Sequence, residues 1–310
     1  MANRTVRSSR RAKQAYGQGI VELCDEDDPS RQAAGLIVRI RGAFDLPQYA
    51  PPLLPLAALE VHQLSQAKNV KLEQVLQTLE KDPLLAARVL RVANSALYAG
   101  APLQSLHHAI MRLGMQNLAN VVWEVALTMR VFRSKAYAAP MEQIRRHSVA
   151  VAHVSRLVAQ LTPIALDYAF LCGLLHDVGA AAILLLLSES PPDQALPDDV
   201  LSQVLGAAHA DASQIIAKSW KLPNDLQLVL AHHHAVTSGG YAHPTAAIVA
   251  IAERLVAEEG PATGLPASSW DSTPQSSQRA AEQALQIGEP ALDKLRKRTA
   301  ELLREVAQAS

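Results

Sequence analysis

The chain contains 310 residues, 49% of them hydrophobic, so it can bury a substantial core as one large domain or two modest ones. Its 29 basic and 29 acidic residues balance, which excludes a general electrostatic attraction to nucleic acid or to an anionic membrane. Only two cysteines, Cys24 and Cys172, are present and they lie far apart, which argues against a disulfide framework and for a reducing compartment, the cytoplasm.

Residues 1–48 are predicted to form a flexible N-terminal arm that is first basic and then acidic. The first 20 residues carry five basic side chains and no acidic one, and the acidic segment CDEDDPS follows. We interpret the basic part as a solvated tail, and nucleic acid or an acidic partner as the less favoured alternative. The start lacks the apolar segment of a signal peptide, so export is not expected.

From about residue 53 onward, apolar residues recur at three- and four-residue spacing, which predicts an all-α chain without strands. Helices are expected at Leu56–Gln66, Lys71–Glu80, Pro83–Asn94, Ser105–Leu113, Gln116–Phe132, Met141–Gln160, Asp167–Asp177, Ala181–Leu187, Asp199–Trp220, Asn224–His234 and Thr245–Glu259. Asp82 is expected to cap the third helix, with Pro83 in its first turn, and Gly114 to close the fourth. The apolar run Val178–Leu187 is too short to cross a bilayer, which takes about 20 residues.

The last part of the chain is predicted to be a loop followed by two helices. Residues 260–277 are rich in Gly, Pro, Ser and Thr, which is typical of a loop. The terminal helices lie within residues 279–308, at Arg279–Ile287 and Ala291–Ala307. The second carries an apolar stripe of Leu292, Leu295, Leu302 and Val306, which most simply packs back on the domain, although an oligomer seam is an alternative.

A histidine and an aspartate, His176 and Asp177, interrupt the apolar segment Phe170–Leu187. Burying such groups without partners costs about 2–7 kcal/mol per polar group, so the pair needs a partner elsewhere in the chain. Adjacent helical side chains point about 100° apart, so both reach one object only near a helix end, which Gly179 is expected to supply. A metal ion fits this geometry.

Further ligands of this kind lie at or near the ends of other predicted helices. The complete predicted metal-ligand set is His147, His176, Asp177, His209, His232, His233 and Glu253. Imidazole and carboxylate are accepted by divalent iron, manganese, zinc and nickel, and the set is large enough for one or two ions. The other histidines are interpreted as surface or hydrogen-bonded core residues: His62, His107, His108, His153, His234 and His243.

Several phrases resemble the HDOD branch of the HD superfamily of metal-dependent phosphohydrolases. They are APPLLPLAALEVHQL, LEKDPLLAARVLRVANSALYAG, SLHHAIMRLGMQNLANVV, AFLCGLLHDVG and SWKLPNDLQLVLAHH, in the expected order over roughly residues 50–258. The resemblance implies an HDOD domain at 49–308, with an N-terminal helical lobe at about 49–135 and an HD-type helical core at about 136–258. It also implies a bacterial regulatory role, in cyclic dinucleotide, chemosensory or stress signalling.

Three positions depart from related phosphodiesterases. Ala180 stands where the HD-GYP branch has the lysine of HD-x-G-K, which removes a cation that can meet a phosphate. The segment with Gly240, Tyr241 and Pro244 is only faintly similar to the glycine-tyrosine-proline signature of that branch. Glu253 stands where the last HD ligand is usually an aspartate.

Two functions follow from the resemblance. The favoured one is a regulatory module that binds a signalling protein through the helices between residues 56 and 132, where Trp123 and Met129 are expected mainly to be core residues. The alternative is metal-assisted hydrolysis of phosphomonoesters or phosphodiesters, nucleotides and cyclic dinucleotides included, in which Asp177 would be the catalytic residue that bridges the ions or orients the water. Arg145 and Arg146 are interpreted as a solvated helix face rather than a phosphate site.

Overall fold

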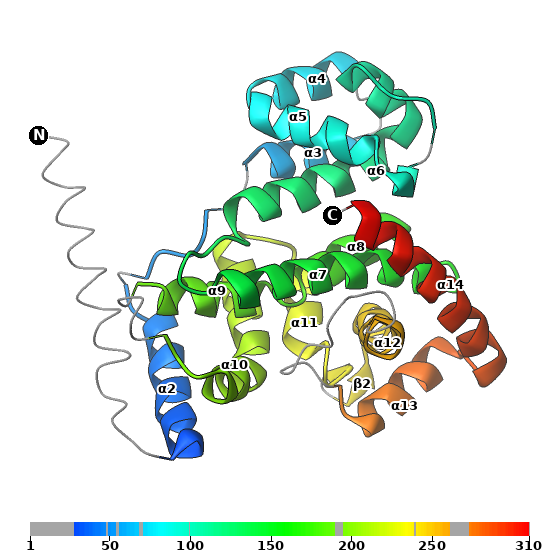
Figure 1. Ribbon diagram of the computed structural model, residues 1–310. Coiled ribbons are helices and arrows are strands. Elements are labelled where there is room, and N and C mark those ends of the chain that lie inside the picture. Colours follow the sequence, from blue (N-terminus) through cyan, green and yellow to red (C-terminus); the bar gives the residue numbers. More distant parts are fainter. Residues whose placement is uncertain are drawn as a thin grey trace, which may run out of the picture.

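The fold is helical almost throughout, as the sequence predicts (Figure 1). The computed structural model describes residues 28–47, 49–53, 56–67, 71–98, 100–189, 195–238, 240–260 and 273–309. Cys24 and the basic segment of the arm lie outside these residues, whereas Cys172 is buried in the core.

An N-terminal lobe lies at the top of Figure 1. It contains α3 (Leu56–Gln66), α4 (Leu72–Glu80), α5 (Pro83–Ala93), the short helix η1 (Ala96–Tyr98) and α6 (Leu106–Arg130). The predicted cap at Asp82 is confirmed, because its side chain accepts a hydrogen bond from the Leu85 amide at 3.1 Å. The predicted break at Gly114 is confirmed as well, since its φ of 73° interrupts α6 with a kink.

The core below the lobe is built by the six helices that follow α6 in the chain. These are α7 (Ala138–Ala159), α8 (Leu166–Leu175), α9 (Val178–Leu187), α10 (Asp198–Ser219), α11 (Asn224–His232) and α12 (Pro244–Glu259). Helix α7 packs on α8 and α12, and α9 packs on α10. Leu166–Leu187 is the one stretch of the described chain with the length and hydropathy of a membrane span, and it is 94% buried inside this core.

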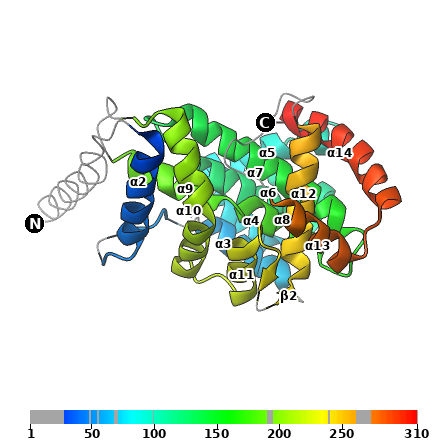
Figure 2. The same cartoon turned by 90° about the horizontal axis from the view of Figure 1, so that it is seen from below.

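The prediction of a flexible arm is wrong for residues 29–44. They form a further helix, α2 (Pro29–Phe44), which Asp28 caps by accepting a hydrogen bond from the Ser30 amide at 2.9 Å. The helix lies against α10 at one end of the molecule (Figure 2). Its buried residues are Ala33, Leu36, Ile40, Ala43 and Phe44. These residues form one apolar stripe along the helix. Burial of the stripe against α10 stabilises the helix, although charged residues precede it in the sequence.

The C-terminal helices lie at the opposite end of the molecule (Figure 2). Helix α13 (Gln275–Leu285) begins four residues before the predicted Arg279, and α14 (Glu289–Ala309) follows it. Helix α14 packs on α7, α12 and η1, which confirms that its apolar stripe packs on the same chain. Leu303, rather than the predicted Leu302, is fully buried in that stripe.

A two-strand hairpin was not predicted. Strands β1 (Thr237–Ser238) and β2 (Tyr241–Ala242) pair antiparallel between α11 and α12. Each strand has only two residues, which is too short for an alternating apolar pattern to be visible in the sequence. The hairpin leads the chain from the histidine run on α11 into α12, which carries Glu253.

Candidate metal site

His176 and Asp177 lie in the turn between α8 and α9, and this turn is the centre of the candidate site. Ser213 of α10 fixes the turn, because its hydroxyl donates to the His176 carbonyl at 2.7 Å and accepts from the Gly179 amide at 2.9 Å. The two side chains therefore project from a corner rather than from a straight helix. This is how adjacent residues reach one centre, as the sequence predicts.

Gly179 does not end a helix, so its predicted role is wrong. It lies in the first turn of α9, where the backbone of α10 approaches closely. A Cβ atom at this position would lie 2.1 Å from the carbonyl oxygen of His209 and 2.3 Å from the amide nitrogen of Ser213. The glycine is required because it lets α9 and α10 come together, which brings His209 next to Asp177.

Three buried histidines are held in the same tautomer by backbone carbonyls. The Nδ1 atom of His176 lies 2.7 Å from the Gly173 oxygen, that of His209 lies 2.7 Å from the Leu205 oxygen, and that of His233 lies 2.8 Å from the Leu230 oxygen. A carbonyl oxygen only accepts, so each Nδ1 carries the proton and each Nε2 presents a lone pair. Such a hydrogen bond to the other ring nitrogen is the usual support of a metal-binding histidine.

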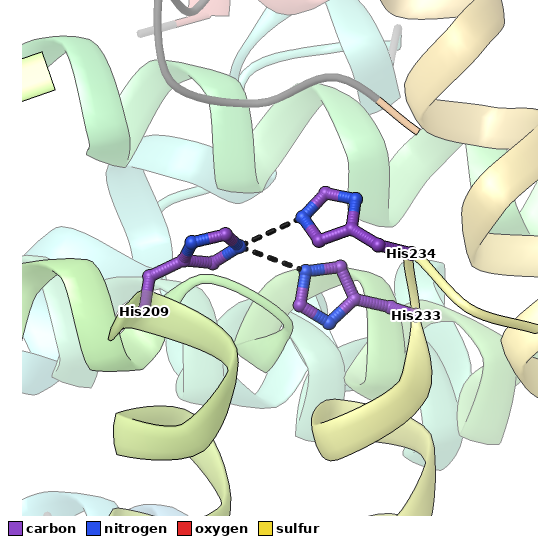
Figure 3. A group of neighbouring side chains, drawn as sticks. All are labelled: His209, His233 and His234. Carbon is purple, nitrogen blue, oxygen red and sulfur yellow. Dashed lines mark hydrogen bonds between the residues drawn. The ribbon is translucent and has the colours of Figure 1, made fainter. Parts of the chain in front are cut away.

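The first donor set consists of His209, His233 and His234 (Figure 3). The Nε2 atom of His209 lies 3.2 Å from that of His233 and 2.8 Å from that of His234. The lone pairs of neutral imidazoles repel one another at such distances unless a proton or a metal cation lies between them. Ligands of one ion with bonds of about 2.0–2.1 Å are themselves about 3.0–3.4 Å apart, so this set fits a metal.

The second donor set consists of His147, His176 and Glu253, whose ligand atoms lie within 4.8 Å of one another. Within this set the His176 Nε2 atom lies 3.2 Å from Oε1 of Glu253. Asp177 stands between the two sets: its Oδ2 atom lies 3.5 Å from His176 Nε2, and its Oδ1 atom lies 3.5 Å from His209 Nε2. One carboxylate oxygen thus faces each set, an arrangement that suits a bridging ligand.

Thr273 connects the two sets and was not predicted as a site residue. Its hydroxyl donates to Oε2 of Glu253 at 2.9 Å and lies 3.1 Å from Nδ1 of His234. Because the only hydroxyl proton is used on the carboxylate, Thr273 accepts from His234 Nδ1–H, which leaves Nε2 of His234 as the metal-facing atom. Thr273 was placed in a loop by composition alone, so no sequence signal pointed to it.

The structure brings together six of the seven predicted ligands and replaces the seventh. His232 is the last residue of α11 and belongs to neither donor set, whereas His234, predicted to have no metal role, joins the first set. The three consecutive histidines cannot be separated by residue type. The position of the helix end decides between them, because the chain turns after His232 and directs the next two rings inward.

Hydrogen bonds near the hairpin connect three helices that carry or adjoin the ligands, α8, α11 and α12. The Tyr168 hydroxyl of α8 donates to Asp225 of α11, and Nε2 of His243 lies 3.0 Å from the other oxygen of Asp225. His243 in turn caps α12, with its Nδ1 atom accepting from the Ala246 amide at 3.4 Å. His243 is therefore a structural histidine, as predicted.

Burial keeps His233 in its neutral form. The side chains of His147, His176, Asp177, His209, His233 and Glu253 are buried, and these residues are between 0% and 6% exposed. Burial, followed by the neighbouring charges of His234, His209 and His176, holds the pKa of His233 well below its ordinary value, against the opposite effect of Asp177. His233 is consequently neutral at neutral pH, which is the form that binds a metal.

Arg145 is not part of a solvated face as predicted. It is buried on α7 and its guanidinium makes a two-point contact with the Glu142 carboxylate, at 2.8 Å and 2.6 Å. This pairing raises the pKa of Arg145. A guanidinium engaged in this way is not presented to a phosphate in the site.

Replacing Thr273 with valine is expected to weaken metal binding by about 10- to 100-fold, the usual effect of losing a group that orients a ligand. The valine keeps the shape of the side chain but releases both Glu253 and His234. Competition with a coloured chelator measures the affinity. Thr273→Ser should retain it, and Thr299→Val is the matched control, because the buried Thr299 hydroxyl makes no hydrogen bond with the described residues. Equal affinity of Thr273→Val and wild type would contradict the assignment.

Comparison with known proteins agrees with this arrangement of helices. The family model of the HDOD domain matches residues 52–236. A solved HDOD domain protein from Geobacter sulfurreducens superposes with a TM-score of 0.68 at 21% identity, covering 88% of this chain and 98% of its own. A Shewanella amazonensis SB2B protein, provisionally named a metal-dependent phosphohydrolase, gives 0.66 at 18% identity, covering 90% and 99%.

A third solved structure, a Marinobacter aquaeolei VT8 protein provisionally named a signal transduction protein, gives a TM-score of 0.63 at 18% identity, with 96% of this chain and 64% of its own covered. At these identities the likeness establishes the HD-type helical fold and nothing about activity. Among curated proteins, none matches this sequence.

Proposed function

The chain belongs to the HDOD family, and from this starting point we propose that it is a bacterial signal-transduction module that binds a partner protein and holds a divalent metal centre within its core. The observation that carries the proposal is the largely buried donor set around Asp177. A structural metal site is surrounded by protein ligands, whereas a catalytic one keeps a position for water or substrate. Six of the seven ligand residues are at most 6% exposed, and the side chain of His234 is 21% exposed. Protein therefore surrounds most of the donor set, which favours the structural role.

The N-terminal lobe is the proposed binding surface for the partner protein. Leu53 and Leu56 are 85% and 71% exposed, and Leu84 on α5 is 57% exposed. Trp123 is fully buried, so it supports the lobe from inside and does not take part in binding. Apolar side chains gathered on one lobe are typical of a protein interaction site. The signal class that we propose is cyclic dinucleotide, chemosensory or stress signalling in the cytoplasm.

A metal-dependent phosphohydrolase is the second candidate, and one observation favours it. Two donor sets that share Asp177 resemble sites in which two ions activate water and stabilise both oxygens of a displacement at phosphorus. In this alternative the histidines and Glu253 would hold the ions, and Asp177 would bridge them or orient the water. The fully buried Ala180 stands where the HD-GYP branch has a lysine, which removes a cation that can meet the phosphate and weighs against hydrolysis.

Elemental analysis combined with a hydrolysis assay separates the two candidates. For protein purified without chelators, we expect one or two equivalents of divalent iron, manganese, zinc or nickel and no turnover of bis(4-nitrophenyl) phosphate or of a cyclic dinucleotide. Turnover that disappears in Asp177→Ala would overturn the regulatory proposal in favour of hydrolysis. Turnover that survives in Asp177→Ala would come from a contaminant, and absence of metal would refute both candidates.

A further inference from the structure

A cavity lies between the N-terminal lobe and the C-terminal helix, away from the candidate metal site. It has a volume of about 390 Å³ and its walls come from η1, α6, α7 and α14. Figure 1 shows the C-terminal end of α14 beside the lobe, and α14 contacts η1 there. Volumes of about 300–1,000 Å³ are typical of sites for small molecules.

The inner wall of the cavity contains a buried imidazole without a hydrogen bond at Nε2. His153 is 5% exposed, and its Nε2 atom lies 3.8 Å from Oε2 of Glu124, the nearest carboxylate. Neither atom has a hydrogen-bond partner among the described residues. A buried polar group usually has such a partner, so this pair leaves hydrogen-bonding capacity unused behind the cavity wall. His153 lies six residues after His147 on α7, which separates the cavity from the metal ligands by about 9 Å along the helix.

Charges of both signs line the rest of the cavity. Arg156 is half-buried on α7, and no hydrogen bond or ion pair ties down its guanidinium within the described part of the chain. On α14, Arg298 donates to the side chain of Gln160 at 3.1 Å. Glu301 and Glu305 follow one and two turns later on the same face of α14. The two arginines and two glutamates balance in formal charge, so a strongly anionic molecule is not the best complement.

Apolar groups occupy the remaining wall. Leu97 of η1, Leu157 of α7 and Leu302 of α14 contact the cavity, together with the ring of Tyr98. A ligand that fits therefore needs an apolar body as well as one group of each charge. An amphipathic zwitterion has this combination: its carboxylate meets Arg156 and Arg298, its ammonium group meets the glutamates, and its side chain packs on the leucines.

We propose that this cavity is a binding site for a small amphipathic zwitterion with the chemistry of a free amino acid or a dipeptide. The cavity and the metal centre have no residue in common, so this proposal can be tested independently of the proposed function. Its ligand contacts the lobe through η1 and the core through α7 and α14. Binding therefore stabilises the contact between α14 and the lobe, which gives a regulatory module a way to sense a metabolite.

Thermal unfolding and isothermal titration calorimetry of the full chain test the proposal. The probes are the twenty common amino acids and a set of apolar dipeptides, with AMP and hexanoate as a purely anionic nucleotide and a purely anionic amphiphile. We expect at least one amino acid or dipeptide to raise the Tm and to bind with one-to-one stoichiometry. Binding of AMP or hexanoate alone, or of no probe, would overturn the proposal.

Two substitutions test whether the probe binds in the cavity. Arg156→Gln should weaken its binding at least tenfold, and Leu302→Trp, which fills the cavity from a half-buried position, should abolish it. The matched control is Arg304→Gln, an exposed arginine of α14 outside the cavity. Unchanged binding in both Arg156→Gln and Leu302→Trp would show that the probe binds elsewhere and would refute the site.

Discussion

The Gly179→Ala variant is expected to be less stable than wild type by at least about 3 kcal/mol, at the upper end of the effect of overpacking a core. The added Cβ atom meets backbone atoms of α10 at 2.1 Å and 2.3 Å. Backbone cannot rotate out of the way as a flexible side chain does, so α9 has to move away from α10. That movement also breaks the hydrogen bond from the Gly179 amide to Ser213 and displaces His209 from Asp177.

Urea unfolding followed by circular dichroism measures this effect. Gly35→Ala in α2 is the matched control, because a Cβ atom there has nothing within 4 Å. Alanine is the better helix former by about 0.5–1 kcal/mol, so the control should be as stable as wild type or slightly more stable. If the free energy of unfolding of Gly179→Ala were within about 1 kcal/mol of that of the control, the close approach of α9 and α10 would be refuted.

The Asp177→Ala variant is expected to lose nearly all bound metal. Its two carboxylate oxygens face the two donor sets at 3.5 Å each, so one substitution removes a ligand from both. His209→Ala should remove the ion of the first set and His147→Ala that of the second, so each should lose about half of the content if wild type holds two ions. The metal content follows from elemental analysis of protein prepared in parallel.

Thermal stability supplies a second measurement of the same prediction. A metal that binds only the folded state stabilises it, by about 2.7 kcal/mol at a free concentration of 100 times Kd. Chelation with EDTA should therefore lower the Tm of wild type and leave that of Asp177→Ala unchanged. His232→Ala is the control, because His232 belongs to neither donor set, and it should respond to EDTA as wild type does. If His232→Ala lost its bound metal, the assignment of His233 and His234, rather than His232, as ligands would be refuted.

Local features of the fold were predictable because their causes are local. The helix that begins at Asp82 and Pro83 follows from a cap and a proline only three residues from the hydrogen bond they organise. The kink at Gly114 follows from a backbone conformation that glycine adopts readily. The residue types of the metal site were predictable for a similar reason, since a histidine and an aspartate inside an apolar segment need a partner wherever they are buried.

Long-range packing decided the rest. The choice of His233 and His234 over His232 depends on where α11 ends, and one residue of difference rotates a helical side chain by about 100°. The role of Gly179 depends on α10, whose nearest residue to it, His209, lies 30 residues away in the sequence, and Thr273 reaches Glu253 across 20 residues. Helix α2 is ordered by its contact with α10 rather than by its own composition. The sequence by itself therefore determined the helices from residue 56 onward and the kinds of ligand. Only the tertiary structure decided that α2 forms and which atoms meet, because both depend on how whole helices pack.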